Sequence, residues 1–102
     1  MDYGQAQELM KLQQEAARIK EKLGNTHIEA EVDGVVVTVN GEMQVVSTVI
    51  EDTSLLSPSN KEKLQKAFTD AANKGIKKAQ EVAAEEMRAM MGGLGMNLPG
   101  MQ

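Results

Sequence analysis

The longest uninterrupted pattern in this 102-residue chain is helical, and it is too long for a compact domain. Between residues 61 and 91 there is no proline and one glycine, and apolar residues keep helical spacing from Leu64 to Met90. A helix of this length would extend about 45 Å, whereas a compact domain of about 100 residues has a radius of gyration of about 13 Å. We therefore expect the helix to project from the domain or to pack against another subunit.

A narrower helical pattern opens the chain at residues 5–23. The apolar positions of this segment are spaced alternately by 3 and 4 residues, which is a seam suited to packing against one neighbour. The seam comprises Leu9, Leu12, Ala16, Ile19 and Leu23. Gly24 follows as a helix stop.

Three strands are predicted between the two helices. Residues 27–33 alternate apolar with polar side chains, which indicates a strand with one wet, acidic face that Gly34 ends. Residues 35–39 read VVVTV, a β-branched run typical of a more buried strand. Residues 43–50 read MQVVSTVI and form the returning strand, with a loop at residues 51–60 before the long helix.

Asn40-Gly41 is a strong hairpin signal between the second and third strands, because both residues tolerate positive φ. Two registers are open. A two-residue loop places Val37 opposite Gln44, and a three-residue loop places Val37 opposite Val45, which aligns the apolar faces better.

The predicted fold is α+β, a single α-β-β-β-α domain over residues 1–91 with a three-stranded antiparallel sheet and two long helices that cover part of it. Such a sheet has two open edges. Edge-to-edge pairing with a second copy would remove one of them, so we expect a homodimer. Residues 92–102 are rich in Gly and Met and are predicted to be a flexible tail.

The composition argues against catalysis. There is no Cys and one His, His27, so thiolate metal sites are excluded and a zinc site is unfavoured. The adjacent acid pairs Glu51-Asp52 and Glu85-Glu86 point different ways on a strand or helix, and no phosphate loop precedes a helix. We predict no enzyme activity, no metal, no cofactor and no small-molecule substrate.

Nothing in the sequence resembles a secretory signal or an apolar run of the roughly 20 residues that a membrane helix needs. We therefore expect a soluble, cytoplasmic protein without a membrane partner.

The charges are segregated along the chain. The net charge is −4, and residues 25–56 hold six acids and no Lys or Arg. The cations lie in the two helical segments, where they form stripes suited to DNA phosphates, although an ordinary solvated helix face gives the same pattern. The candidate DNA-binding residues are Lys11, Arg18, Lys22, Lys63, Lys66, Lys74, Lys77 and Lys78.

Several segments together resemble the YbaB/EbfC family of nucleoid-associated proteins. They are QAQELMKLQQE, VDGVVVTVNGEMQVV, SLLSPSNKEKLQKAFTDAANKGIKKAQE, the later EEM and the closing GGLGMNLPG, in that order over the whole chain. The resemblance implies a dimer formed through the sheet, with helical arms that project like tweezers. It also implies a nucleoid protein that binds, bends or compacts double-stranded DNA and influences gene expression.

Two departures from the family pattern concern the sheet. Val36 stands where a basic or polar residue is usual, and residues 43–50 contain no Lys or Arg. Any DNA contacts should therefore come from the helices, with weak sequence preference, because few aromatics and no Asn/Arg cluster are present to read bases.

An alternative interpretation also fits these features. The acidic strands, the helix seams and the Met-rich tail are consistent with a non-enzymatic dimeric scaffold that docks another protein.

Overall fold

The computed structural model describes residues 3–93, and its elements follow the predicted α-β-β-β-α order. They are α1 (Tyr3–Gly24), β1 (His27–Val32), β2 (Val35–Asn40), β3 (Val45–Ile50), the short 3-10 helices η1 (Thr53–Leu56) and η2 (Pro58–Asn60), and α2 (Lys61–Gly93). This confirms the α+β fold, with each predicted helix and strand bounded within two residues. Gly92 and Gly93 belong to α2, and the rest of the predicted tail, residues 94–102, lies outside the described residues.

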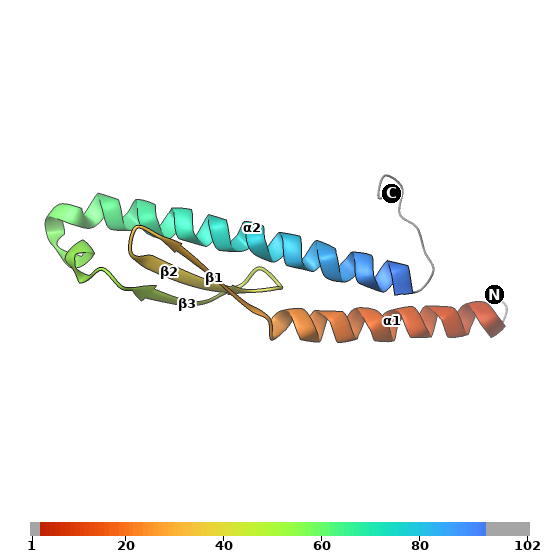
Figure 1. The fold of residues 1–102 in the computed structure, drawn as a ribbon. Helices are drawn as coiled ribbons and strands as arrows, with labels where there is room; N and C mark the ends of the chain where they lie inside the picture. Colours follow the sequence, from red (N-terminus) through yellow and green to blue (C-terminus); the bar gives the residue numbers. More distant parts are fainter. Residues whose placement is uncertain (1–2, 94–102) are drawn as a thin grey trace.

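The molecule is elongated, as the length of its second helix predicts. Its principal extents are 67 × 26 × 17 Å and its radius of gyration is 19.1 Å, against about 13 Å for a compact chain of this size. Figure 1 shows α2 running along the sheet and beyond it, where its last turns lie beside α1. The first turns of α1 continue past the end of α2, so the two helices form a projecting arm.

The sheet is antiparallel in the order β1-β2-β3. β1 and β2 are joined by the two residues Asp33 and Gly34, whose φ angles are 49° and 89°, and Val32 pairs with Val35 across them. Positive φ at both central residues defines the tight hairpin turn that matches the twist of the strands. Asp33-Gly34 is therefore a hairpin signal in its own right, whereas Gly34 was predicted only to end the first strand.

The predicted register between β2 and β3 is wrong. Val37 lies opposite Thr48, instead of Gln44 or Val45. The loop occupies residues 41–44, and the pairing shifts between Thr38 and Val39, so that Val46 is an additional, bulged residue of β3. The longer loop and the bulge move β3 along β2 relative to either predicted register.

Asn40 explains this longer loop. Its side-chain oxygen accepts hydrogen bonds from the backbone N–H groups of Glu42 (3.0 Å) and Gln44 (3.1 Å), and its amide donates to the Gln44 side chain (2.9 Å). The positive φ of the loop falls at Met43 (66°) instead of at Asn40-Gly41. Asn40 is 6% exposed, so its polar atoms are satisfied by this loop instead of by water.

The core is a contact between small residues of α2 and β-branched residues of the sheet. The fully buried members are Val35, Val37, Val39, Leu55, Ala67, Ala71 and Ala79. At Gly75 the helix comes so close that an added Cβ would lie 3.3 Å from both methyls of Val39 and 3.6 Å from the Cβ of Ala30. At Gly75 this face of α2 therefore has no room for a side chain larger than Ala.

The expectation that both helices cover the sheet is wrong, because α2 does so alone. α2 contacts β1 and β2, whereas α1 packs on the far part of α2 through a second cluster of Ile19, Leu23 and Met90. A helix about 10 Å wide covers roughly two strands spaced about 4.8 Å apart. α2 is therefore too narrow to cover β3 as well.

Several residues predicted to be buried are exposed as a result. Leu9 of the α1 seam is 47% exposed. Phe68, one of the apolar residues at helical spacing between Leu64 and Met90, is 41% exposed. On β3, Val45, Val46 and Val49 are 47–52% exposed. An exposed apolar strand at a sheet edge is a surface that proteins normally pair or cover.

We predict that Gly75→Val lowers the free energy of unfolding by about 1–3 kcal/mol, the usual cost of overpacking a core. Urea unfolding at fixed protein concentration measures this change. Ala84→Val is the control, because Ala84 is exposed on the same helix and should lose only about 0.5 kcal/mol of helix propensity. Equal losses for the two variants would contradict a close α2–sheet contact at Gly75.

Hydrogen exchange should divide α1 in two. Residues 4–11 of α1 are all exposed, whereas Ile19 and Leu23 are buried against α2. In the free protein we expect amides of residues 4–11 to exchange at least tenfold faster than those of residues 19–23. Uniform protection along α1 would show that its first turns are covered in solution.

Candidate nucleic-acid interface

All eight cations predicted to bind DNA are exposed, and all lie on the two helices. Three are on α1 and five are on α2. The structure brings the α1 cations together in one stripe, but it spreads the α2 cations along most of that helix. From Lys63 to Lys78 is 15 residues, or about 22 Å of helix.

The α1 stripe is neutralised in part by two carboxylates. Arg18 Nη2 lies 2.8 Å from Glu15 Oε2 on the same helix, and Lys22 Nζ lies 2.8 Å from Glu86 Oε1 on α2. The hydrogen bond and the charge of Glu15, with a smaller effect of Glu86, raise the pKa of Arg18. The third cation, Lys11, forms no ion pair within residues 3–93.

A groove of about 260 Å³ lies between α1 and α2 at this stripe. Its lining residues are Lys11, Glu15, Arg18, Ile19, Glu86, Ala89 and Met90. The charged members come from both helices, and the apolar members belong to or adjoin the cluster that joins α1 to α2. In this groove, charged side chains of α1 and α2 therefore face a common space.

On α2, two of the predicted cations are already engaged. Lys66 Nζ lies 3.3 Å from Asp70 Oδ2, and Lys74 Nζ donates a hydrogen bond of 3.3 Å to the backbone oxygen of Glu31 on β1. Lys77 and Lys78 form no ion pair or hydrogen bond with the described part of the chain. They are therefore the α2 cations most available to a ligand.

Lys63 lies at the opposite end of α2 from the arm, near Asp52. Hydrogen bonds from the hydroxyl and backbone N–H of Ser54 lower the pKa of Asp52, and the positive charge of Lys63 lowers it further. The charge of Lys63 thus interacts with Asp52 in the loop before α2, far from the α1 stripe.

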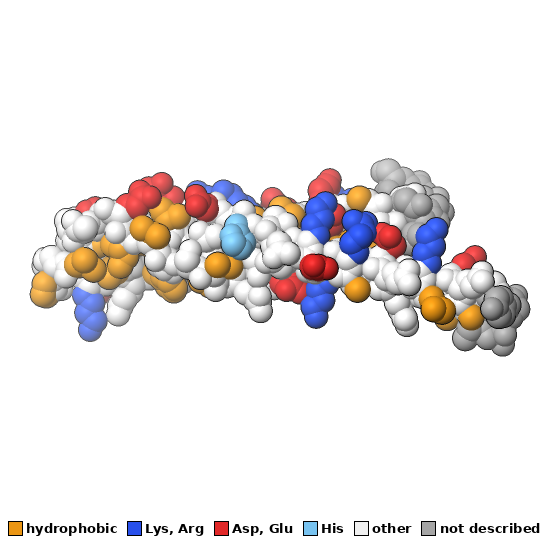
Figure 2. Space-filling view, turned by 90° about the horizontal axis from the view of Figure 1, so that it is seen from below, with side chains coloured by type: hydrophobic (Ala, Val, Ile, Leu, Met, Phe, Trp, Pro, Cys, Tyr) orange, Lys and Arg blue, Asp and Glu red, His pale blue; other side chains and the backbone are white. Residues whose placement is uncertain are grey.

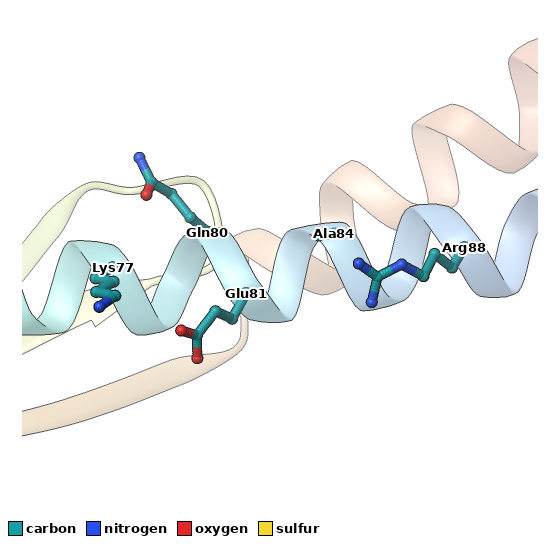
Figure 3. Close-up of a pocket in the computed structure, with 5 residues that line it drawn as sticks. All are labelled: Lys77, Gln80, Glu81, Ala84 and Arg88. Carbon is teal, nitrogen blue, oxygen red and sulfur yellow. The ribbon is translucent and has the colours of Figure 1, made fainter. Parts of the chain in front are cut away.

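The structure adds Arg88, which sequence reasoning missed. Together with Lys77, Gln80, Glu81 and Ala84 it lines a shallow groove of about 300 Å³ along α2 (Figure 3). Lys66, Lys77 and Arg88 are spaced by 11 residues, which is three helical turns, so they repeat along one side of α2. This spacing was the signal that could have identified Arg88.

Acids interrupt this side of α2 at the same period. Asp70 and Glu81 are also 11 residues apart, and Arg88 lies 3.7 Å from Glu85. The face predicted to be lysine-rich is therefore a row of alternating charges. Its attraction for phosphate depends on which cations lack a partner.

The sheet has a different character from the arm. β1 presents Glu29 and Glu31 on the face turned away from α2, and both are exposed. In Figure 2, hydrophobic side chains gather over the half of the molecule that holds the sheet, while Lys and Arg are intermixed with Asp and Glu over α1. Cations for an anionic ligand thus lie on the helices.

Residues 3–93 hold neither a candidate metal site nor a candidate membrane span. This part of the chain contains no group of three or more His, Asp or Glu side chains placed to hold a metal ion. Neither described helix is both long enough and apolar enough to cross a membrane.

Known proteins show the same sequence pattern over nearly the whole chain. The model of the YbaB/EbfC DNA-binding family matches residues 2–94. A nucleoid-associated protein of Syntrophobacter fumaroxidans is 39% identical over 98 residues, covering 94% of this chain and 86% of that protein. Another from Pelotomaculum thermopropionicum is 35% identical over 96 residues, covering 92% and 89%.

A solved structure has the same fold. The crystal structure of an uncharacterised Helicobacter pylori protein superposes with a TM-score of 0.75 at 29% sequence identity. The match covers 89% of this chain and 98% of that one.

Proposed function

Because the chain belongs to the YbaB/EbfC DNA-binding family, we propose that it is a non-enzymatic, nucleoid-associated protein of the cytoplasm whose helical arms bind double-stranded DNA. The observation that supports this most is the position of the cations. Every Lys and Arg of the chain is on α1 or α2, and the sheet carries acids. A polyanion is attracted to the helices and repelled from β1.

The binding we propose has weak sequence preference. Exposed lysines contact phosphates, which fix the position of a protein on DNA but do not read its bases. The single Phe and single Tyr of the chain offer little surface for stacking on bases. Any preference should therefore come from the shape and flexibility of the duplex.

The functional unit we propose is a homodimer joined at β3. Within residues 3–93, β3 pairs with β2 on one side only, and it exposes Val45, Val46 and Val49. The other edge strand, β1, carries Glu29 and Glu31 and is unsuited to pairing with a copy of itself, because like charges would lie together. Pairing through β3 would bury apolar surface and satisfy an open row of backbone groups.

A dimer gives two arms, each with its own cations. Two arms that hold separate segments of one duplex would bend it, and arms on different duplexes would bring them together. Bending and compaction therefore follow from the elongated shape of the protomer if both arms bind at once.

A double charge reversal tests the DNA interface. Lys77→Glu with Lys78→Glu should weaken binding to a random-sequence duplex at least tenfold at low salt, because two unpaired cations per protomer become acids. Glu29→Lys with Glu31→Lys changes the same number of charges on β1 and should alter affinity less than threefold. Fluorescence anisotropy of a labelled duplex measures both.

Equal and opposite effects of the two double reversals would contradict a localised interface on the helices. They would indicate that the affinity for DNA depends only on the net charge of the protein.

The dimer is tested by Val49→Lys. A charge at the exposed edge of β3 should convert the dimer to a monomer in sedimentation velocity at micromolar concentration. Glu29→Lys, on the other edge strand, is the control and should leave the dimer intact. If Val49→Lys sediments like the unmodified protein, β3 is not the interface.

A further inference from the structure

We propose that the groove between α1 and α2 is a phosphate-binding position of the DNA interface, and that Glu86 holds the bordering cation Lys22 in an ion pair in the free protein. The inference rests on the proposed DNA-binding function. It assigns to one acidic residue a role in setting how strongly the arm binds DNA.

The composition of the groove carries the proposal. Lys11, Arg18 and Lys22 line or border it with three positive charges, whereas Glu15 and Glu86 contribute two negative ones. With both acids in place, the local net charge is +1. Without Glu86 it would be +2, so this carboxylate removes half of the net charge that a phosphate would meet.

The acids lie deeper than the cations. The side chain of Glu86 is 25% exposed and that of Glu15 is 34% exposed, whereas those of Lys22 and Arg18 are 55% and 62% exposed. Lys has three donor hydrogens and Arg has five. The cations therefore keep unused donors directed at solvent, where a phosphate oxygen can reach them.

Carboxylate and phosphate compete for the same kind of contact. Both accept charge-assisted hydrogen bonds from Lys and Arg, so a phosphate entering the groove must displace Glu86 from Lys22 or accept its repulsion. The position of α1 does not depend on this ion pair alone. Ile19 and Leu23 are also held against Met90 by apolar contact.

Because Lys22 is already paired with Glu86 before DNA binds, it should contribute less to the affinity for DNA than an unpaired lysine does. A cation that is already neutralised by a carboxylate gains less from DNA than a free one. The slope of log K against log[salt] should therefore correspond to fewer phosphate contacts than there are cations on the arm.

Glu86→Gln tests the inference, because it keeps the size of the side chain and removes its charge. We expect the affinity for a random-sequence duplex of about 25 base pairs to rise roughly fivefold in about 0.1 M salt. The plot of log K against log[salt] should steepen by about 1 for each groove that gains a phosphate contact.

Two matched variants separate the groove from general electrostatics. Glu21→Gln removes the same charge one residue from Lys22, at an exposed position with no ion pair within the described residues, and should change affinity less than twofold. Lys22→Gln with Glu86→Gln removes the released cation as well, and the gain in affinity should disappear. Urea unfolding midpoints confirm that all three proteins are folded.

Three results would overturn the inference. Equal gains for Glu86→Gln and Glu21→Gln, or a gain that persists in the double variant, would mean that only net charge matters. A loss of affinity in Glu86→Gln would mean that the carboxylate orients the cations for DNA instead of competing for them. Failure of the proposed function is distinguishable, because the unmodified protein would then bind no duplex even at low salt.

Discussion

The close contact between α2 and the sheet determines the rest of this structure. Ala67, Ala71, Gly75 and Ala79 let the helix lie directly on the valines of β2 and on Ala30 of β1. A contact built from such small residues covers two strands and no more. Its consequence is that β3 stays exposed except at Ile50 and that α1 packs on α2 instead of on the sheet. The remaining length of α2 therefore carries α1 outward as an arm.

This arrangement separates the surfaces of the protomer by their chemistry. The sheet end carries exposed valines on β3 and acids on β1. The arm carries Lys11, Arg18 and Lys22 on α1 and Arg88 on α2. In the proposed dimer the first surface joins two copies and the second binds DNA. In the proposed interface, the ion pairs Lys22–Glu86 and Arg18–Glu15 reduce the positive charge that the arm presents to phosphate.

The sequence was sufficient to predict the elements, because hydrophobic period depends on local geometry alone. It also identified the α1 stripe of Lys11, Arg18 and Lys22, since residues 7 and 4 apart share a helix face. It could not predict the β2–β3 register, because that register depends on hydrogen bonds that Asn40 makes with the loop. It could not predict the exposure of Phe68 either, because that depends on how many strands one helix covers. The ion partners of Lys22 and Lys74 were equally inaccessible, because Glu86 and Glu31 are distant in sequence and meet these lysines only in the fold.

The most direct test of this account is the salt dependence of DNA binding by the unmodified protein. A labelled random-sequence duplex would be titrated at several salt concentrations and followed by fluorescence anisotropy. If the lysines and arginines of the helices contact DNA phosphates, log K should fall linearly with log[salt], with a slope that corresponds to several phosphate contacts per dimer. Absence of binding at low salt, or binding that is independent of salt, would contradict it. Attention would then move to protein partners of the exposed apolar residues Leu9, Met10 and Met87.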